Sequence, residues 1–236
     1  ADVVCVGSGA AGAIAAVTAR GEGAEVVVLD KQPICGGTTA RSGGVTWIPN
    51  HPILREQGID DDKASALRYM VRYAFPRQYA PNSATLGLDD ADYRKLEAFY
   101  DNGSRMVERL ADLGALRFAQ FRMWAADTVP PDYGGNLSEN EVPRGRALLP
   151  VSEQDASEGQ SGADMTRSLE AWLREHDVPI LNDHRVTRVL TRGERVVGVE
   201  AQHGDRTLRV RARRGVVFAT GGYAHNEALI ATHQQA

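Results

Sequence analysis

The hydrophobic pattern at the start of the chain predicts a strand, a helix and a second strand. Residues 2–6 and 25–29 are continuous apolar runs, the pattern of strands that are buried on both faces of a parallel sheet. Between them, residues 10–20 are rich in alanine and predict a helix whose small side chains allow close packing on that sheet. This order predicts a βαβ unit and an α/β fold.

The middle of the chain predicts two amphipathic helices followed by a long irregular segment. Asp62 is placed to cap one helix, and a second helix covers about 90–113 and stops before Gly114. Residues 125–162 contain prolines, a glycine pair and many polar residues. Because structureless segments of this length are uncommon in compact domains, we expect either a functional loop or a partly disordered segment.

The last third of the chain predicts a helix and then mainly strands. The helix covers about 164–176, and the fully buried strand pattern returns at 215–219, before a short helix that starts near residue 225. Between these elements, three segments alternate apolar and polar residues and are separated by glycine-containing turns, which predicts an antiparallel meander with one solvated face. The three segments are residues 185–191, 195–202 and 206–213.

The composition is that of an ordinary globular protein. The chain has 236 residues, of which 42% are hydrophobic and 25% charged, enough for one large domain or two small ones. The net charge of −4 and the lack of a run of basic residues argue against nucleic acid as a partner. The apolar stretches are too short for a transmembrane segment.

The same composition leads us to expect a cytoplasmic protein without a metal site. Two cysteines make neither a disulfide scaffold nor a metal framework, and the histidines show no metal-binding spacing. No signal peptide leads the chain, although it opens on Ala1, immediately before its first strand, so a trimmed leader stays open.

A glycine-rich motif joins the first strand to the first helix. It reads Gly7-Ser8-Gly9-Ala10-Ala11-Gly12. The first glycine permits a tight turn, the second lets a pyrophosphate approach the backbone, and the third lets helix and strand pack closely. Asp30 ends the second strand, where a carboxylate accepts hydrogen bonds from ribose hydroxyls and repels the 2′-phosphate of NADP. The alternative is a tight turn that binds no ligand.

A second glycine-rich stretch separates FAD from NAD as the predicted cofactor. Residues 35–50 read CGGTTARSGGVTWIPN, with bare backbone at Gly36, Gly37, Gly43 and Gly44. The hydroxyl residues of this stretch, Thr38, Thr39 and Ser42, add hydrogen-bonding groups. Such an extended contact region suits a ligand longer than NAD, and the apolar residues 47–49 would anchor it in the core beside a flavin. The alternatives are a flexible surface loop and a plain NAD dehydrogenase.

Four stretches of the chain carry a family resemblance. They are DVVCVGSGAAG, VVVLDK, GGTTARSGGVTWIPN and RRGVVFATGGYAHN. Together they resemble the flavoproteins of the fumarate reductase/succinate dehydrogenase group, and within it the 3-ketosteroid Δ1-dehydrogenases, in which a run like residues 42–50 is characteristic. The resemblance covers residues 1–50 and about 165–236.

The resemblance implies an α/β, Rossmann-like FAD-binding domain over residues 1–236, built from a parallel sheet with helices and a small antiparallel β-meander at 185–213. Residues 51–162 would be a helical and loop-rich insertion. The family's substrate-capping domain and C-terminal FAD segment have no counterpart here. We therefore expect the FAD-binding half of a larger enzyme, a fragment, a processed product or a subunit, whose active site a second chain or a missing C-terminal half completes.

The resemblance also implies which residues bind non-covalent FAD. Gly37 holds the place at which succinate dehydrogenase-type members attach flavin to a histidine. The ADP half would contact Gly7, Gly9, Gly12 and Asp30, with Ala10, Ala11 and Lys31 beside them. The pyrophosphate, ribityl chain and flavin would contact Gly36, Gly37, Thr38, Thr39, Ser42, Gly43 and Gly44. The backbone of Val186 would meet the adenine, and Thr220, Gly221 and Gly222 would close on the cofactor.

For activity, the resemblance implies dehydrogenation of a carbon–carbon bond next to a ketone, with hydride passing to the flavin and a small hydrophobic ketone, steroid-like in preference, as substrate. Tyr133 is the nearest analogue of a substrate-lining catalytic tyrosine, although a surface-loop tyrosine is the preferred interpretation. Arg144 and Arg146 could contact an anionic substrate, although a solvated loop is the preferred interpretation. The alternative functions are a fumarate- or urocanate-type ene-reductase and an FAD-binding module that is inactive alone.

Overall fold

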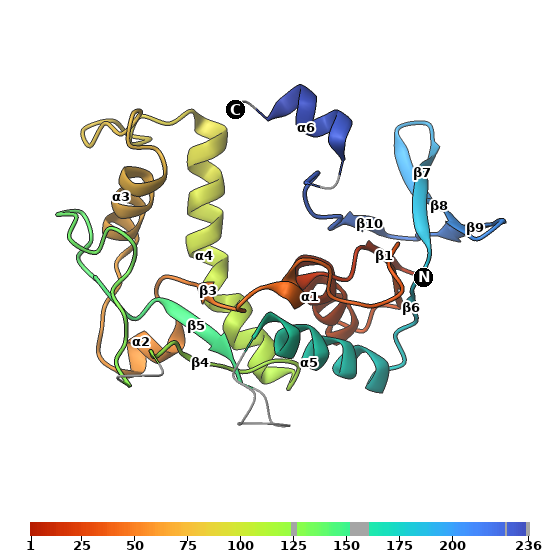
Figure 1. Ribbon diagram of the computed structural model, residues 1–236, viewed down its shortest axis with the longest axis horizontal. Helices are drawn as coiled ribbons and strands as arrows, with labels where there is room; N and C mark the ends of the chain where they lie inside the picture. The colour runs from red at the N-terminus through yellow and green to blue at the C-terminus, as the bar shows by residue number, and fades with distance from the viewer. Residues whose placement is uncertain (124–126, 152–160, 225, 235–236) are drawn as a thin grey trace. The chain divides into compact units, whose positions relative to one another are not determined.

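The computed structural model describes residues 1–123, 127–151, 161–224 and 226–234, which form two compact units (Figure 1). The first unit comprises Ala1–Ser42 and Met165–Ala236, and the second comprises Gly43–Asp164. The sequence pattern placed buried strands only in the parts of the chain that form the first unit.

The first unit is built on a four-stranded parallel sheet in the order β10-β1-β2-β6. Its strands are β1 (Val3–Val6), β2 (Val26–Leu29), β6 (Ile180–Leu181) and β10 (Gly215–Phe218). Helix α1 (Ala10–Gly21) joins β1 to β2 and packs on both strands (Figure 1). The predicted βαβ unit is thereby confirmed, and all four residues of β2 are buried as the apolar run indicated.

The register of this sheet brings three chain segments to one edge. Val6 at the end of β1 is level with Leu29 of β2 and with Phe218 of β10. Because the strands are parallel, the segments that follow them leave the sheet together, beginning at Gly7 and Asp30 and, after β10, at Ala219. In open α/β sheets this carboxyl edge is where ligands bind.

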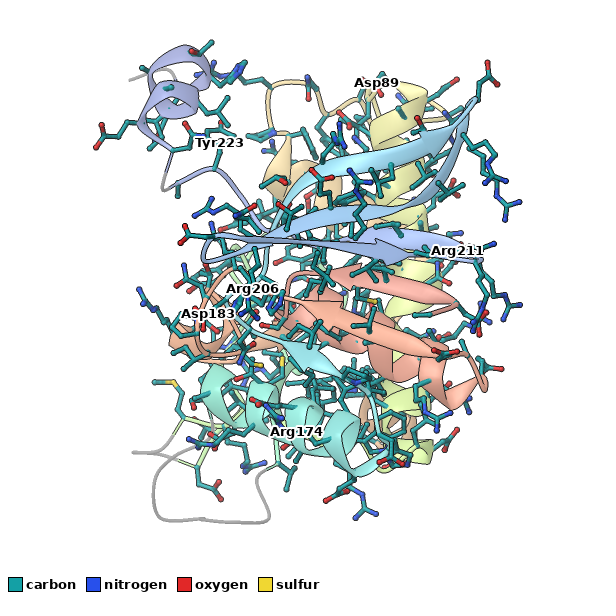
Figure 2. All side chains as sticks on the ribbon, turned by 90° about the vertical axis from the view of Figure 1, so that its right-hand side faces the viewer. Asp89, Arg174, Asp183, Arg206, Arg211 and Tyr223 are labelled. Atoms are coloured by element: carbon teal, nitrogen blue, oxygen red, sulfur yellow. The ribbon has the colours of Figure 1, made fainter. Side chains whose placement is uncertain are left out.

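The meander of the first unit is also present. Its strands are β7 (Arg185–Arg192), β8 (Arg195–His203) and β9 (Arg206–Arg211), which pair antiparallel and agree with the predicted segments within two residues. Val199 and Ala201 on its inner face join the core formed by β1 and β2. Figure 2 shows Asp183 and Arg206 at one end of this sheet and Arg211 at the other. Helices α5 (Gly162–Glu175) and α6 (Glu227–His233) complete the last third of the chain.

The second unit contains three helices and a small antiparallel sheet. The helices are α2 (Pro52–Glu56), α3 (Lys63–Ala74) and α4 (Asp90–Asp112). The predicted cap of α3 is confirmed, because the Asp62 carboxylate accepts hydrogen bonds from the backbone N–H groups of Ala64 and Ser65 at 2.9 and 3.0 Å. None of the helices among the described residues has the length and apolarity needed to span a bilayer.

The small sheet corrects the sequence prediction. Its order is β3-β5-β4, with β3 (Thr46–Trp47), β5 (Ala147–Pro150) and β4 (Phe118–Gln120). Strand β5 lies inside the segment 125–162 that we predicted to be irregular, of which residues 125–126 and 152–160 lie outside the described residues. The sequence hid this strand because it is four residues long and pairs only with short segments that are distant in the chain.

A glycine-to-alanine exchange tests the close packing of α1. A Cβ atom at Gly12 would lie 1.9 Å from the carbonyl oxygen of Gly7, a backbone atom that cannot move aside. We expect Gly12→Ala to lower the free energy of unfolding of the cofactor-free protein by roughly 3 kcal/mol, the upper end of typical overpacking costs. Chemical denaturation measures this change.

The matched control is Gly215→Ala in β10, where a Cβ atom meets nothing within 4 Å. This control should be neutral or slightly stabilising, because alanine restricts the unfolded chain more than glycine does. Equal losses in the two variants would contradict the packing role of Gly12.

Candidate functional site

Two glycines of the motif allow three backbone segments to meet at the carboxyl edge of the sheet. Gly7 has a φ of +103°, and a Cβ atom there would lie 2.3 Å from the carbonyl oxygen of Ala219, just after β10. Gly12 approaches Gly7 equally closely from inside α1. Both glycines are therefore required by packing, whether or not a ligand is bound.

Gly9 differs from these two residues, because the protein leaves room beside it. It is the N-cap of α1, with an extended backbone and no side-chain cap, and a Cβ atom there would find its nearest neighbour, Thr39 Oγ1, at 3.6 Å. The bare N-terminus of α1 thus carries the partial positive charge of a helix end and has no steric obstacle of its own. This arrangement suits a phosphate group.

Asp30 is tied to the motif by a short chain of hydrogen bonds. Its Oδ2 atom accepts from both the backbone N–H and the hydroxyl of Ser8, and its Oδ1 atom accepts from the N–H of Gln32 at 2.9 Å. The Ser8 hydroxyl oxygen in turn accepts from the N–H of Gly36 at 3.0 Å. One buried hydroxyl therefore joins the ends of β1 and β2 to the start of the second glycine-rich stretch.

These contacts limit what Asp30 can offer a ligand. The side chain is only 7% exposed, and its carboxylate already accepts three hydrogen bonds from the protein. Each carboxylate oxygen accepts about two hydrogen bonds, so Oδ1 keeps one position for a ribose hydroxyl. Lys31, the next residue, is exposed at the same edge of the sheet.

The second glycine-rich stretch begins beside the N-terminus of α1. Thr39 Oγ1 accepts a hydrogen bond from the N–H of Ala10 at 3.1 Å, and the Ser42 hydroxyl donates to the Thr39 carbonyl at 2.8 Å. The Thr39 hydroxyl therefore holds the 3₁₀ turn of η1 (Thr39–Arg41) against the helix, and the Ser42 hydroxyl closes the turn itself. Next to this turn, Gly37 and Thr38 are exposed.

Gly36 and Gly37 serve different purposes. A Cβ atom at Gly36 would lie 2.7 Å from the Cβ of Ala40, so this glycine is required for packing. A Cβ atom at Gly37 would meet nothing within 4 Å, although its φ of +50° still favours glycine. Like Gly9, Gly37 presents bare backbone to open space, and it offers no side chain for covalent attachment of a flavin.

Backbone hydrogen bonds bring Val186 towards the same edge. The N–H of His184 donates to the carbonyl of Asp30 at 2.8 Å, and the N–H of Asp183 donates to the carbonyl of Gln32 at 3.0 Å. The start of β7 is thereby tied to the end of β2. Val186, two residues further on, packs against the core of the first unit.

The segment after β10 completes the edge. Thr220, Gly221 and Gly222 are exposed and directly follow Ala219, which contacts Gly7. A Cβ atom at Gly221 or Gly222 would meet nothing within 4 Å. The first unit thus brings together three glycine-bearing segments, from the motif, the second stretch and the end of β10.

Gly43 and Gly44 begin the second unit. A Cβ atom at Gly43 would meet nothing within 4 Å, whereas one at Gly44 would lie 2.5 Å from the backbone of Ser161. Gly44 is therefore a packing glycine within its own unit. The apolar anchor that follows packs in the same unit, where Ile48 is buried and Trp47 lies against Tyr69 and Phe99.

Tyr133 lies in a loop of the second unit with its side chain 82% exposed. Its carbonyl oxygen accepts a hydrogen bond from the Tyr69 hydroxyl at 2.6 Å. The Tyr73 ring stacks on the Tyr133 ring, with 6.5 Å between centroids. The phenol of Tyr133 therefore faces solvent while the backbone that carries it is held in place.

Arg146 corrects our interpretation of its segment as a solvated loop. The side chain is fully buried, and its guanidinium pairs with the carboxylates of Asp61 and Asp132. It also donates to Asn140 Oδ1 at 2.7 Å. Burial and these ion pairs remove Arg146 from contact with any substrate anion, whereas Arg144 is exposed.

Two contributors were missed by sequence reasoning. Ser8 occupies a variable position of the motif, yet its hydroxyl joins Asp30 to Gly36. Asp132 directly precedes Tyr133, and its carboxylate bonds to the buried Arg146. A small hydroxyl residue between two motif glycines was a weak signal for the first. The sequence held no signal for the second, because the partner of Asp132 becomes buried only in the folded chain.

The chain belongs to a family of FAD-binding domains. The family described as "FAD binding domain" matches residues 2–236. FAD is therefore the cofactor of this site. The residues of the first unit fit it, because the bare end of α1 and the open backbone at Gly9 and Gly37 form a cradle that side chains would fill.

Curated relatives are dehydrogenases of cyclic ketones and a fumarate enzyme. The whole chain matches 49% of the length of a 3-oxosteroid 1-dehydrogenase of Mycolicibacterium smegmatis, with 29% sequence identity. A match of 97% of the chain covers 44% of the length of a 4-oxocyclohexanecarboxylate 2-dehydrogenase of Sinomonas cyclohexanicum, with 30% sequence identity. A NADH:fumarate oxidoreductase of Klebsiella pneumoniae is 24% identical over 99% of the chain and 22% of the relative.

A solved structure shares the fold over nearly the whole chain. The 3-ketosteroid-Δ4-(5α)-dehydrogenase of Rhodococcus jostii has a TM-score of 0.76 at 27% identity, over 98% of this chain and 48% of that one. The chain therefore spans about half the length of the relatives that it matches first. The expected FAD-binding, Rossmann-like fold with its antiparallel meander is confirmed.

Ser8→Ala tests the hydrogen-bond chain at the site. The change leaves the buried N–H of Gly36 without its acceptor, so the second glycine-rich stretch loses its tie to Asp30. We expect the Kd for FAD to rise about tenfold, as one lost hydrogen bond of ordinary strength would cause. Titration of the cofactor-free protein with FAD, followed by flavin fluorescence, measures the Kd.

The control is Thr207→Ala in β9, which removes an exposed hydroxyl that bonds to Gln202. It should leave the Kd for FAD unchanged. The role of Ser8 would be refuted by a Kd that stays at the wild-type value in the Ser8 variant as well.

Proposed function

We propose that this chain is the FAD-binding part of an oxidoreductase that dehydrogenates a carbon–carbon bond adjacent to a ketone. The observation that carries the proposal is the match of nearly the whole chain to both cyclic-ketone dehydrogenases. In the names of both enzymes the dehydrogenated position, 1 or 2, lies two ring atoms from the oxo position, 3 or 4. A small hydrophobic cyclic ketone, steroid-like in preference, is therefore the proposed substrate class.

The chemistry explains why these positions matter. A ketone acidifies the C–H bond next to it, so a proton leaves that carbon and the adjacent carbon gives up a hydride as the double bond forms. FAD, when bound, supplies the acceptor for that hydride. The protein's contribution is to hold the cofactor, orient the ketone and accept the proton.

Residues of the first unit divide the work of binding non-covalent FAD. The N-terminal amides of α1 at Gly9 and Ala11 bind the pyrophosphate, while the N–H of Ala10 between them donates to Thr39 Oγ1. Asp30 Oδ1 accepts from a ribose hydroxyl. Open backbone at Gly37 and at residues 220–222 lies along the rest of the cofactor. Val186 meets the adenine through its backbone.

Tyr133 is the residue of this chain that we propose to contact the substrate. Its phenol is exposed on a fixed backbone, which suits a group that meets a ligand rather than the core. The rest of the active site comes from a second chain or from a further segment of a longer protein. We place the protein in the cytoplasm.

A second candidate function is an ene-reductase acting on an acidic substrate. The observation that favours it is the match of 99% of the chain to the NADH:fumarate oxidoreductase. The site binds the same cofactor in both cases, and the direction of electron flow separates them.

Flavin bleaching separates the two functions. We expect the flavin of the full-length protein, mixed anaerobically with a 3-oxosteroid, to lose its visible absorbance, because the ketone donates a hydride. Stopped-flow absorbance measures the rate. Failure of the ketone to bleach the flavin, together with reoxidation of dithionite-reduced flavin by fumarate, would overturn the dehydrogenase proposal in favour of the ene-reductase.

Tyr133→Phe tests the substrate contact. Loss of one hydroxyl in the reacting geometry should lower the rate of flavin bleaching by 10²- to 10⁴-fold, the usual range for a proton-transfer group. The Kd for FAD should not change, since the proposal gives this residue a role in contacting the substrate and none in binding the cofactor. Tyr79→Phe is the control, and a bleaching rate equal to that of this control would remove Tyr133 from the site.

A further inference from the structure

We propose that Arg146, Asp132 and Tyr69 are positioning residues that hold the loop of Tyr133 so that its phenol is presented to the substrate. The inference rests on the proposed role of Tyr133 and deepens it. It concerns contacts within the second unit alone. It is based on the fully buried guanidinium of Arg146, which bonds to the residue immediately before the exposed Tyr133.

Arg146 is the residue that the other members of this arrangement contact. Its side chain has no exposed surface, and its Nε and Nη2 atoms donate to the two oxygens of Asp61 at 2.7 and 2.8 Å. The rings of Trp47 and Tyr69 lie 5.3 and 5.1 Å from its Cζ atom. This paired and stacked geometry fits the planar fork of arginine and would not suit lysine.

The remaining guanidinium nitrogen, Nη1, bonds to the loop that carries Tyr133. Nη1 donates to Asp132 Oδ2 at 2.9 Å and to Asn140 Oδ1 at 2.7 Å, so two points of the loop meet at one nitrogen. Asp132 also donates its N–H to the carbonyl of Pro143 at 2.9 Å, and an isolated bridge pairs Pro131 with Arg144. The residue immediately before Tyr133 is thus fixed through both its side chain and its backbone.

Tyr69 fixes Tyr133 itself from the other side. It lies on α3, is 4% exposed, and donates its hydroxyl to the Tyr133 carbonyl at 2.6 Å. Burial raises the pKa of Tyr69 to about 12, so the hydroxyl stays protonated and remains a donor at neutral pH. The same Tyr69 ring that covers Arg146 therefore holds the backbone of the candidate substrate contact.

These ties act on the backbone and leave the phenol of Tyr133 outside. Its ring is 82% exposed and touches the ring of Tyr73, which is itself 49% exposed. Core packing gains little from an aromatic side chain held in this position. The buried ion pairs of Arg146 hold the backbone beneath this exposed phenol. Presentation of the phenol to a ligand explains the arrangement.

Tyr69→Phe removes one hydroxyl and keeps the ring over Arg146, so it tests the tie without emptying the core. The full-length FAD-loaded protein, with 3-fluorotyrosine incorporated at position 133, provides the first readout. We expect Tyr69→Phe to shift and broaden the ¹⁹F resonance and to speed amide hydrogen exchange in residues 132–140. Thr85→Val is the matched control, because its hydroxyl also donates to a backbone carbonyl, that of Leu88 at 2.6 Å, and contacts none of the residues that hold the Tyr133 loop.

Kinetics provide the second readout. We expect Tyr69→Phe to slow flavin bleaching by the ketone about tenfold, and to add no further loss in a Tyr133→Phe background, because it acts through Tyr133. Asp132→Asn keeps a side-chain oxygen that can accept from Arg146 and should show a smaller loss. A merely stabilising role would instead give equal losses in both backgrounds.

Two results would overturn the inference. One is a Tyr69→Phe protein whose ¹⁹F resonance and hydrogen exchange match those of Thr85→Val. The other is a loss of rate that is the same with and without Tyr133. If the wild-type flavin is not bleached by the ketone, the proposed function fails, whereas the fluorine and exchange readouts still decide whether Tyr69 holds the loop.

Discussion

Close contact between backbone segments at the carboxyl edge of the parallel sheet is the constraint on which the cofactor site depends. Gly12 lies against Gly7, and Gly7 lies against Ala219, at separations that admit no methyl group. Helix α1 can therefore begin directly beside the ends of β1 and β10. Its N-terminus, where the N-cap Gly9 has no side chain, then lies at the edge where an anionic ligand is stabilised by the helix end.

The polar contacts of the site follow from this packing. Once Gly7 turns the chain into α1, Ser8 is buried between Asp30 and Gly36 and bonds to both. That hydroxyl draws the second glycine-rich stretch against α1, where Thr39 meets the N–H of Ala10. Glycines required by packing and glycines open to a ligand thus alternate along the same short segments.

The second unit uses a different principle, in which one buried charge organises several loops. Burying a guanidinium is costly unless every arm is satisfied, and Arg146 is satisfied by two carboxylates and an amide. Removing any one partner would leave a buried N–H of the guanidinium without an acceptor, so these loops are held together as a set. These contacts meet the backbone on either side of Tyr133, while its phenol remains in solvent.

Local patterns determined much of this protein. The apolar runs identified β1, β2 and β10 and the alternating runs identified the meander, whereas the two-residue strand β6 was missed. The GxGxxG motif and the second glycine-rich stretch together predicted FAD. These features depend on neighbouring residues and on periodicity. The tertiary structure alone decided the β3-β5-β4 sheet, the burial of Arg146 and the tie between Ser8 and Gly36. The partners in these interactions are far apart in the chain, 85 residues in the case of Arg146 and Asp61. A residue's burial and its hydrogen-bond partners are set by which distant segments the fold places beside it, and no local pattern records that.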